Sequence, residues 1–224
     1  EIYQCDWSSD VCSSDLQLQA NGNLQVTATG TLANTGTLAT AGALTVSGAN
    51  VVNGAGADIN SSNTSVKAVD KVSNAGRIEG DTVQVSGPSV VNTGTVIGNN
   101  VQVQGTDIVN NGSTALMAAV RNLNLYAGNS VQNLDGATLY SAGNLQIARD
   151  GTRDTSSGLL ANQTNALINR SATIEADGDI DIAANQVSNT RTSIVTTAGT
   201  PVQTAVKTLA LWQGGLRSEE HTSE

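Results

Sequence analysis

The chain has 224 residues, of which ten are basic and nineteen are acidic, and its formal net charge is −9 at pH 7. This balance excludes the basic surface with which proteins bind nucleic acids, and no apolar run approaches the ~20 residues of a membrane-spanning helix. Aromatic residues make up only 2% of the chain and phenylalanine is absent, so the chain lacks the bulky side chains that fill the core of an ordinary globular domain.

The two ends of the chain look like translations of one DNA segment read on opposite strands. Back-translation of Arg217–Glu224 (RSEEHTSE) gives a DNA sequence whose reverse complement encodes Ser9–Leu16 (SDVCSSDL). This DNA resembles a sequencing-library adaptor. We therefore expect residues 1–16 and 217–224 to be adaptor-derived rather than native, and we leave them out of the reasoning on fold and function.

Leaving out the ends changes the composition. They contain both cysteines, Cys5 and Cys12, and the only histidine, His221. The segment from Cys5 to Cys12 has an alternative interpretation as a small disulfide or metal-binding loop. Residues 17–216 keep nine basic and twelve acidic residues, so their net charge is 9 − 12 = −3. They are nearly neutral and have neither a basic surface nor an acidic tail.

An internal repeat runs through residues 17–192. Its most regular mark is an apolar-x-apolar triplet, and several neighbouring triplets lie 18 to 22 residues apart. The triplets are Leu24–Val26, Leu44–Val46, Val83–Val85, Val101–Val103, Leu123–Leu125, Leu145–Ile147 and Ile180–Ile182. A missing member is expected near Val66–Val69. Chains rich in Gly, Ser and Asn are often disordered, but the regular placement of β-branched residues here indicates repeated short strands.

Two further segments complete each repeat unit. One is an apolar pair before asparagine: Val51–Asn53, Val90–Asn92 and Ile108–Asn110. A turn follows at Asn34, Asn74, Asn92 and Asn110. The other is a short apolar segment at residues 37–39, 77–80, 95–98 and 173–176. Since Gly and Asn tolerate the positive φ of tight turns, each unit reads as three short strands separated by turns.

Three short strands in about twenty residues, repeated along the chain, predict an all-β parallel β-helix (β-solenoid) of about 18–22 residues per coil. Each strand is expected to pair with its counterpart in the next coil, ~4.8 Å away. The side-chain amides of Asn53, Asn74, Asn92 and Asn110 are expected to stack as a ladder in which they satisfy one another's hydrogen bonds.

The alternation of side chains also predicts what is buried. Within one coil, the residues expected inside the solenoid or in packing between strands are Val96, Val101, Val103, Ile108 and Val109. The glutamines between apolar neighbours are expected to face outward: Gln84, Gln102 and Gln146. Burial of a Val or Ile contributes about 1.5–3 kcal/mol, which for one coil is comparable to the ordering entropy of about twenty residues. A single coil should therefore be unstable, whereas a stack of coils should be stable.

Two regions depart from the repeat. Asp150–Gly158 is polar and rich in turn-forming residues, and it is predicted to be a surface loop inserted into the β-helix region of residues 17–192. After Asn189 the turn signals disappear. Residues 193–216 are therefore expected to be an irregular connector, in which Val202–Trp212 is either a short helix or irregular.

The repeats resemble the haemagglutinin repeats of filamentous haemagglutinin-type exoproteins. The segments that carry the resemblance are NTGTLATAGALTVSG, NAGRIEGDTVQVSG, NTGTVIGNNVQVQG and NRSATIEADGDIDIAANQVSNTRT, and it covers about residues 21–192. This family includes two-partner secretion adhesins and the stalks of contact-dependent growth inhibition toxins. The resemblance implies a right-handed β-helix that an outer-membrane transporter partner exports to the cell surface or the medium. Since the family's secretion domain and toxin domain are not recognised here, we expect an internal fragment of a longer exoprotein.

The sequence offers few residues for chemistry. Without His and Cys, residues 17–216 cannot form Ser-His or Cys-His nucleophilic sites or most zinc sites. The densest acidic segment is EADGDIDI, with Glu175, Asp177, Asp179 and Asp181. It reads either as a solvated outer face or as a calcium site. Tyr126 and Tyr140 either pack on the wall or stack on a sugar. We therefore assign no catalytic, metal-binding or cofactor-binding residue and expect no cofactor.

Three functions fit a β-helix. The first is a structural stalk of a secreted or surface-exposed adhesin or toxin, which we favour. The second is a module that binds a receptor or glycan on a host or neighbouring cell. The third is a polysaccharide-degrading enzyme, which needs carboxylates and basic residues facing each other across adjacent coils. The only basic cluster is Lys67, Lys71 and Arg77, and we expect no carboxylate to face it at one coil's spacing. We therefore predict that the chain is not an enzyme.

Overall fold

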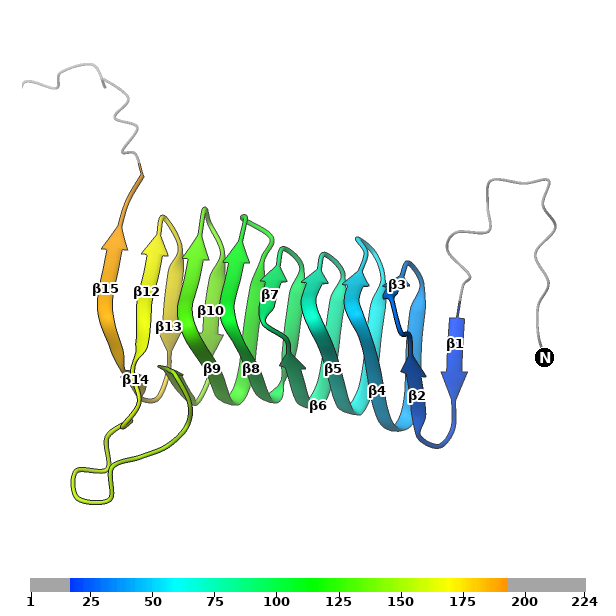
Figure 1. Cartoon of the computed structure of the whole chain (residues 1–224), viewed down its shortest axis with the longest axis horizontal. Helices are drawn as coiled ribbons and strands as arrows, with labels where there is room; N and C mark the ends of the chain where they lie inside the picture. Colours follow the sequence, from blue (N-terminus) through cyan, green and yellow to red (C-terminus); the bar gives the residue numbers. More distant parts are fainter. Residues whose placement is uncertain (1–16, 193–224) are drawn as a thin grey trace, which may run out of the picture. The chain divides into compact units, whose positions relative to one another are not determined.

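The computed structural model describes residues 17–192, and these form an all-β parallel β-solenoid (Figure 1). No helix occurs within this range. The predicted adaptor-derived ends and the predicted connector at 193–216 lie outside the described residues. The fold class expected from the repeats is confirmed.

Fifteen strands make up the solenoid. They are β1 (Gln17–Ala20), β2 (Leu24–Thr27), β3 (Thr31–Asn34), β4 (Thr37–Asn53), β5 (Asp58–Asn74), β6 (Arg77–Ser86), β7 (Ser89–Asn92), β8 (Thr95–Asn111), β9 (Leu116–Leu134), β10 (Thr138–Ser141), β11 (Asn144–Ala148), β12 (Thr164–Arg170), β13 (Thr173–Ala176), β14 (Ile180–Ile182) and β15 (Ala184–Thr190). The long strands β4, β5, β8 and β9 each bend around one whole coil. Other coils are made of two or three shorter strands, as is the coil of β10, β11 and β12.

Each coil contributes one segment to each of three walls. The first wall contains β10 and the strands in register with it, the second contains β11, and the third contains β12. All pairings between named strands are parallel, as in Val83 with Val101 and Val101 with Leu123 on the second wall. The second wall is therefore built from the apolar triplets of the sequence, stacked one coil above the other.

The missing triplet is Thr64–Val66, which pairs with Leu44–Val46 and Val83–Val85. Its first residue is a buried threonine, 2% exposed, whose hydroxyl donates to the carbonyl of Glu79 at 2.7 Å. A polar side chain thus occupies an apolar position because its hydrogen bond is satisfied inside. Val69, included in the expected range, is 71% exposed and is not part of the triplet.

The interior is one continuous apolar core of residues from all three walls. Val96, Val101, Val103 and Ile108 are buried, as predicted. Val109 is only half-buried because it is the outward neighbour of Ile108 on the third wall, where Asn110 points inward again. The outward position of Gln84 is confirmed, and Gln102 and Gln146 are partly exposed at equivalent positions of the second wall.

A ladder of asparagines runs along the third wall, and its members from Asn34 to Asn133 are buried. Each side-chain Nδ2 donates to the Oδ1 of the asparagine in the next coil, at 2.7 to 3.0 Å. In order, the members are Asn34, Asn53, Asn74, Asn92, Asn110, Asn133, Asn169 and Asn189. Several Nδ2 groups also donate to a carbonyl at the turn, as Asn92 does to Gly94 at 3.0 Å. The predicted ladder is confirmed and extends beyond the four asparagines first identified.

A loop between β11 and β12 interrupts one coil without ending the stack. It spans residues 149–163, includes the loop predicted at 150–158, and projects from the stacked strands (Figure 1). Leu167 beyond the loop still pairs with Val131 of β9. The Asn133–Asn169 step of the ladder accordingly spans 36 residues, against 23 for the step before it.

Deletion of one whole coil, Asn92–Val109, is expected to leave the protein folded. The ladder step between Asn92 and Asn110 spans 18 residues, so the deletion joins Val91 to Asn110 and every later strand keeps its inward face. Deletion of only Asn92–Asn100 places the Val101–Val103 strand over the wrong wall, and a shifted register exposes the buried face. Thermal unfolding followed by circular dichroism should show a small loss for eighteen residues and a large loss for nine. Equal losses would mean that the coil boundaries are wrong.

Substitution of Asn92 by alanine should destabilise the protein by about 2 kcal/mol, because a buried polar group left without its partner costs about 1–3 kcal/mol. Asn92 is 1% exposed, and its removal deprives Asn110 Oδ1 of its donor and Asn74 Nδ2 of an acceptor. The free energy of unfolding in urea measures the effect. The matched control is Asn63→Ala, an exposed asparagine of the same coil as Asn74, which should cost less than about 0.5 kcal/mol. Similar losses at both positions would contradict a stabilising ladder.

Candidate functional site

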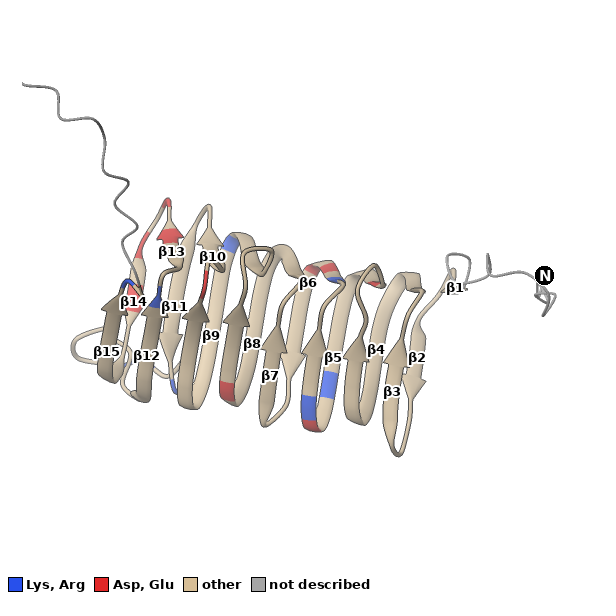
Figure 2. Ribbon diagram, turned by 90° about the horizontal axis from the view of Figure 1, so that it is seen from above, with Lys and Arg blue, Asp and Glu red and all other residues tan. Residues whose placement is uncertain are grey.

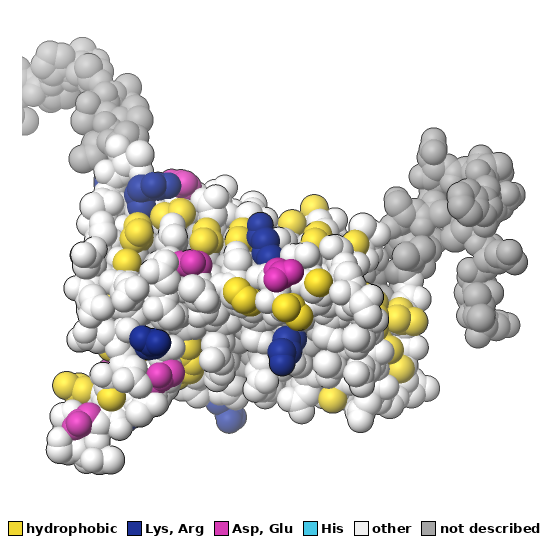
Figure 3. Space-filling model, in the orientation of Figure 1, with side chains coloured by type: hydrophobic (Ala, Val, Ile, Leu, Met, Phe, Trp, Pro, Cys, Tyr) yellow, Lys and Arg dark blue, Asp and Glu magenta, His cyan; other side chains and the backbone are white. Residues whose placement is uncertain are grey.

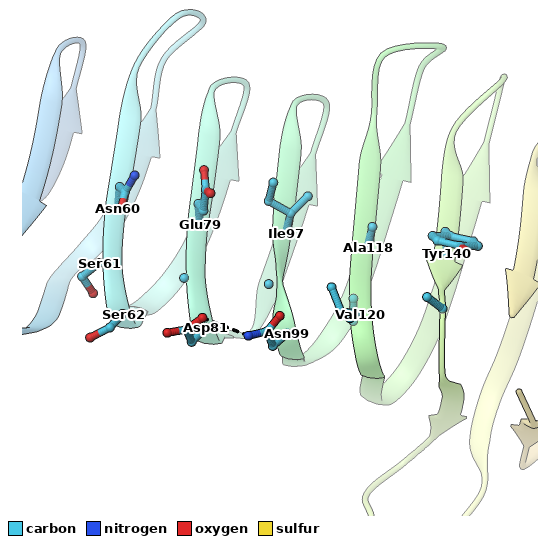
Figure 4. A pocket seen from close by; sticks show the side chains of 14 residues that line it. Asn60, Ser61, Ser62, Glu79, Asp81, Ile97, Asn99, Ala118, Val120 and Tyr140 are labelled. Atoms are coloured by element: carbon cyan, nitrogen blue, oxygen red, sulfur yellow. Dashed lines mark hydrogen bonds between the residues drawn. The ribbon is translucent and has the colours of Figure 1, made fainter. Parts of the chain in front are cut away.

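An open groove runs across successive coils at the corner between the first and second walls (Figure 4). It has a volume of about 510 Å³ and crosses the coils of β5, β6, β8, β9 and β10. Its lining residues are Asn60, Ser61, Ser62, Glu79, Gly80, Asp81, Ile97, Gly98, Asn99, Ala118, Ala119, Val120, Tyr140 and Ala142. The groove is the main candidate site because it gathers polar, charged and aromatic side chains from many coils.

Small residues form the floor of the groove. Ser61, Gly80, Gly98 and Ala119 occupy equivalent positions of successive coils. A Cβ atom added to Gly80 would lie 2.6 Å from the carbonyl oxygen of Ser61, and one added to Gly98 would lie 2.5 Å from that of Gly80. The coils therefore approach closely at this corner, which only small residues permit.

The sides of the groove are polar at one end and apolar at the other. Glu79 and Asp81 stand at the polar end, where Asn99 Nδ2 donates to Asp81 Oδ1 at 2.9 Å. Val120, 59% exposed, and Tyr140 stand at the apolar end (Figure 4). The Tyr140 hydroxyl donates to Asp177 Oδ2 at 2.9 Å, and this hydrogen bond raises the pKa of Tyr140.

Beside the groove, the structure corrects one expectation about charge. Asp58 is the register partner of Arg77 one coil away, and Arg77 also forms an ion pair with Glu79 of its own strand. Carboxylates therefore do lie next to Arg77 at one coil's spacing. The register places Lys67 and Lys71 on other parts of the coil, so the three basic residues do not form one cluster. Asp58 and Arg77 are 19 residues apart, which is one coil's spacing, and the register makes them direct neighbours.

Asp58 is the carboxylate with the most unusual surroundings near the groove. Its Oδ1 atom is buried and has no hydrogen-bond partner among the described residues. Burial raises the pKa of Asp58, and the nearby charge of Glu79 raises it further, while Arg77 opposes both effects. The raised pKa means that ionised Asp58 is a local source of instability rather than a firm anchor.

The acidic segment EADGDIDI does not converge on a metal. Asp177 accepts the hydrogen bond from Tyr140, and Asp181 forms an ion pair with Arg153 at 2.6 Å. Glu175 stands beside Tyr140 in the register of the first wall. Between residues 17 and 192, no group of three or more His, Cys, Asp or Glu side chains is placed to hold a metal ion. The structure therefore gives the calcium interpretation no support.

The two tyrosines have different environments. Tyr126 lies on the second wall, and its hydroxyl donates to Gln146 Oε1 at 3.0 Å. Gly151 at the base of the loop lies so close that an added Cβ would be 2.7 Å from the Tyr126 hydroxyl oxygen. Burial raises the pKa of Tyr126. Tyr126 is therefore a packing residue between wall and loop, and only Tyr140 faces the groove.

The loop itself is tied by local hydrogen bonds. Asp154 accepts from the backbone N–H groups of Ser156 and Ser157 at 3.0 and 2.8 Å and from both hydroxyls, which keeps its pKa well below the usual range. Arg153 donates to the Gly158 carbonyl and pairs with Asp181 on the second wall. Asp154 therefore stabilises the loop itself, and Arg153 connects the loop to the second wall.

Comparison with known families finds a similarity over part of the chain. Residues 19–80 match the model of the haemagglutinin repeat. This segment is therefore similar to haemagglutinin repeats. Such repeats are non-catalytic, structural, and typical of filamentous haemagglutinin-type exoproteins. The match begins in β1 and ends in β6, and the later coils continue the same parallel register.

Searches of curated proteins and of solved structures gave no match. Within residues 17–192, no helix has the length and hydrophobicity needed to cross a membrane.

Replacement of Asp58 by asparagine is expected to stabilise the protein at neutral pH. Because the folded-state pKa of Asp58 is raised above 3.8, the folded protein binds this proton more tightly than the unfolded chain does. The contribution of Asp58 to stability is therefore most favourable below pH 3.8 and declines as pH rises through the folded-state pKa. The difference in thermal midpoint between Asp58→Asn and the parent should grow, in favour of the variant, from acid to neutral pH.

The matched control for this experiment is Asp70→Asn, an exposed carboxylate at another position of the same coil. Its thermal midpoint should follow that of the parent at both pH values. A neutral-pH midpoint of Asp58→Asn below that of the parent would show that ionised Asp58 stabilises the fold.

Proposed function

We propose that this β-solenoid is a stalk segment of a large secreted or surface-exposed bacterial exoprotein, either an adhesin or a contact-dependent growth inhibition toxin, exported by two-partner secretion. The observation that carries the proposal is the haemagglutinin repeat of residues 19–80, continued coil upon coil through β15. Each added coil lengthens a solenoid by about 4.8 Å. A stalk needs such cumulative reach and no active site.

The pairing pattern also suits export through a transporter in the outer membrane. Each coil contacts the coil made just before it, and the ladder steps Asn53–Asn74 and Asn74–Asn92 span only 21 and 18 residues. A chain that emerges from a pore can therefore add coils one at a time onto those already folded. Residues 17–192 contain no cysteine. This part of the chain therefore has no disulfide that would have to be broken before the chain passes through the transporter. We infer a location outside the cell, where the stalk presents a receptor-binding or toxic domain to a host or neighbouring cell.

The charge distribution favours a stalk over a polysaccharide-degrading enzyme. Charged residues are few and scattered over the coils (Figure 2). Several are engaged in structural contacts: Arg77 with Glu79, Arg153 with Asp181, and Arg170 with Asp135. Hydrophobic side chains are likewise dispersed on the face shown in Figure 3. We therefore propose that the segment has no catalytic role.

Fusion of residues 17–192 behind a two-partner secretion domain is expected to yield export when the cognate transporter is co-expressed. The exported segment should fold outside the cell, because its contacts are made between neighbouring coils. The amount of segment found in the medium or on the cell surface measures export, and β-sheet circular dichroism of the released protein measures folding.

The control fusion lacks the secretion domain and should stay inside the cell. A second control is the same fusion with Asn92–Asn100 deleted. It tests whether export depends on correct stacking of the coils. Retention of the intact segment in the periplasm, with the transporter present and functional for its own substrate, would contradict the stalk proposal.

A further inference from the structure

The sequence contains three Asn-Gly pairs: Asn21–Gly22, Asn53–Gly54 and Asn111–Gly112. Asparagine is a chemically labile residue, and it loses its side-chain amide most readily before glycine. Glycine has no Cβ atom, so its backbone nitrogen can approach the asparagine Cγ atom without hindrance. The reaction also needs an amide that is free to rotate, a backbone N–H group without a hydrogen-bond acceptor, and access of water. The structure provides these conditions at only one of the three pairs.

We propose that Asn21 is a site of spontaneous deamidation in the folded protein, and that the fold protects Asn53 and Asn111. In the first step the Gly22 nitrogen loses its proton to base and bonds to Asn21 Cγ, and the side-chain nitrogen leaves as ammonia. Water then opens the cyclic imide at one of its two carbonyl groups, which gives aspartate or isoaspartate. The proposal goes beyond the stalk function and does not depend on it.

The reactive pair lies in the turn between β1 and β2, where Asn21 and Gly22 are both exposed (Figure 1). Among the described residues, no backbone acceptor engages the Gly22 N–H group. The Gly22 carbonyl accepts from the Gly42 N–H group at 3.2 Å, and the side chain that bonds to the next coil is that of Asn23, which accepts from the Ala43 N–H group at 2.9 Å. The turn is therefore held on both sides of the reacting atoms, while the nucleophile and the amide remain free.

The ladder protects Asn53, which is 1% exposed. Its Oδ1 accepts from Asn34 at 2.8 Å, and its Nδ2 donates to Asn74 Oδ1 at 2.8 Å and to the Arg77 carbonyl at 3.0 Å. The Gly54 N–H group, which would have to attack, donates to the Asn34 carbonyl at 2.8 Å. Closing the imide ring would break all of these hydrogen bonds in a dry core, where unpaired polar groups are costly.

Asn111 is protected through its glycine. The Gly112 N–H group donates to the carbonyl of Leu134 in the next coil at 3.1 Å. Asn111 Oδ1 is buried, although it has no hydrogen-bond partner in the part of the chain that the structure describes. The nucleophile is therefore occupied, and the amide oxygen is shielded from water.

The product should affect only the coil of β1, β2 and β3. The coils approach closely beside the turn, because a Cβ atom added to Gly42 would lie 2.6 Å from the Gly22 carbonyl oxygen. Isoaspartate lengthens the backbone of the turn by one methylene group, and both products add a negative charge. Since β1 and β2 pair with β4, deamidation should loosen these two pairings and leave later coils unchanged.

The first experiment incubates the 224-residue chain at mildly alkaline pH and follows the three pairs by peptide mass spectrometry. In the folded chain, Asn21 should react at least about tenfold faster than Asn53 or Asn111. In urea, where the protecting contacts are lost, the three rates should lie within about threefold of one another. Similar rates at all three pairs of the folded chain would overturn the proposal. So would an Asn21 that stays intact over the time in which it reacts in urea.

Gly22→Ala tests the role of the backbone nitrogen. A Cβ atom on Gly22 meets no other atom within 4 Å, so the variant should fold like the parent. Its methyl group should slow the reaction of Asn21 at least about tenfold. The matched control is Gly30→Ala, whose added Cβ also meets nothing within 4 Å, and it should leave the rate at Asn21 unchanged. An undiminished rate in Gly22→Ala, with the parent's thermal midpoint, would refute attack by the Gly22 nitrogen.

Hydrogen exchange of the chain before and after incubation tests the structural consequence. Amides of β1 and β2 should exchange at least about threefold faster in deamidated protein, whereas those of β8 should keep their protection. Unchanged protection of β1 and β2 in fully deamidated protein would show that the product does not loosen this coil. Faster exchange in β8 as well would contradict the expected local effect.

Discussion

The buried ladder of asparagines on the third wall sets the register on which the rest of the structure depends. Each amide both donates to the next coil and accepts from the previous one, as Asn92 does with Asn110 and Asn74. An apolar strand shifted by one residue exposes its buried face, and a shifted amide in addition loses its hydrogen-bond partners inside a dry core. The ladder therefore adds a directional hydrogen-bonded constraint to a register that the apolar core already favours. The inward and outward positions of the other walls agree with this register.

That fixed register also explains where a binding surface can arise. The inward rows are committed to the core, and the floor of the groove is committed to small residues because Gly80 and Gly98 lie against backbone carbonyl oxygens of the preceding coil. The outward rows flanking this floor carry no such requirement. Residues as different as Glu79, Ile97 and Tyr140 occupy one outward row of the first wall. Chemical variety is therefore possible along the groove without a change in the fold.

The sequence predicts the fold well because the repeat is local. Apolar triplets about one coil apart, and an asparagine after each apolar pair, already define walls and ladder. The sequence is less informative where a polar residue substitutes for an apolar one, as Thr64 does with its hydrogen bond to Glu79. It also leaves open whether Val109 lies in the interior or in packing between strands, and the structure places it half-buried on the outward side because the following asparagine faces inward.

The candidate site is harder to predict than the fold. The groove arises from residues 18 to 22 positions apart that stand side by side only once the coils are stacked, and no short motif marks them. The proximity of Asp58 and Arg77 has the same origin: they are 19 residues apart in the sequence and direct partners in the register. A signal is present in the sequence, in the small residues Ser61, Gly80, Gly98 and Ala119 at coil spacing, but its meaning requires knowing where the corner lies.

The loop of residues 149–163 shows how such a solenoid can acquire new surface without losing its register. Strand β12 pairs with β9 although the ladder step from Asn133 to Asn169 spans 36 residues rather than about twenty. Closing a longer loop costs only about 0.6 kcal/mol for each doubling of its length. Residues 149–165 replace a connection of three residues, 127–129, in the preceding coil, so the insertion costs about 1.5 kcal/mol on this scale. The hydrogen bond from Asn133 to Asn169, at 3.0 Å, is as short as the uninterrupted step from Asn110 to Asn133. A corner of the coil is therefore a position where residues can be added at small cost, because the amide ladder, rather than the length of chain between its members, determines which strands meet.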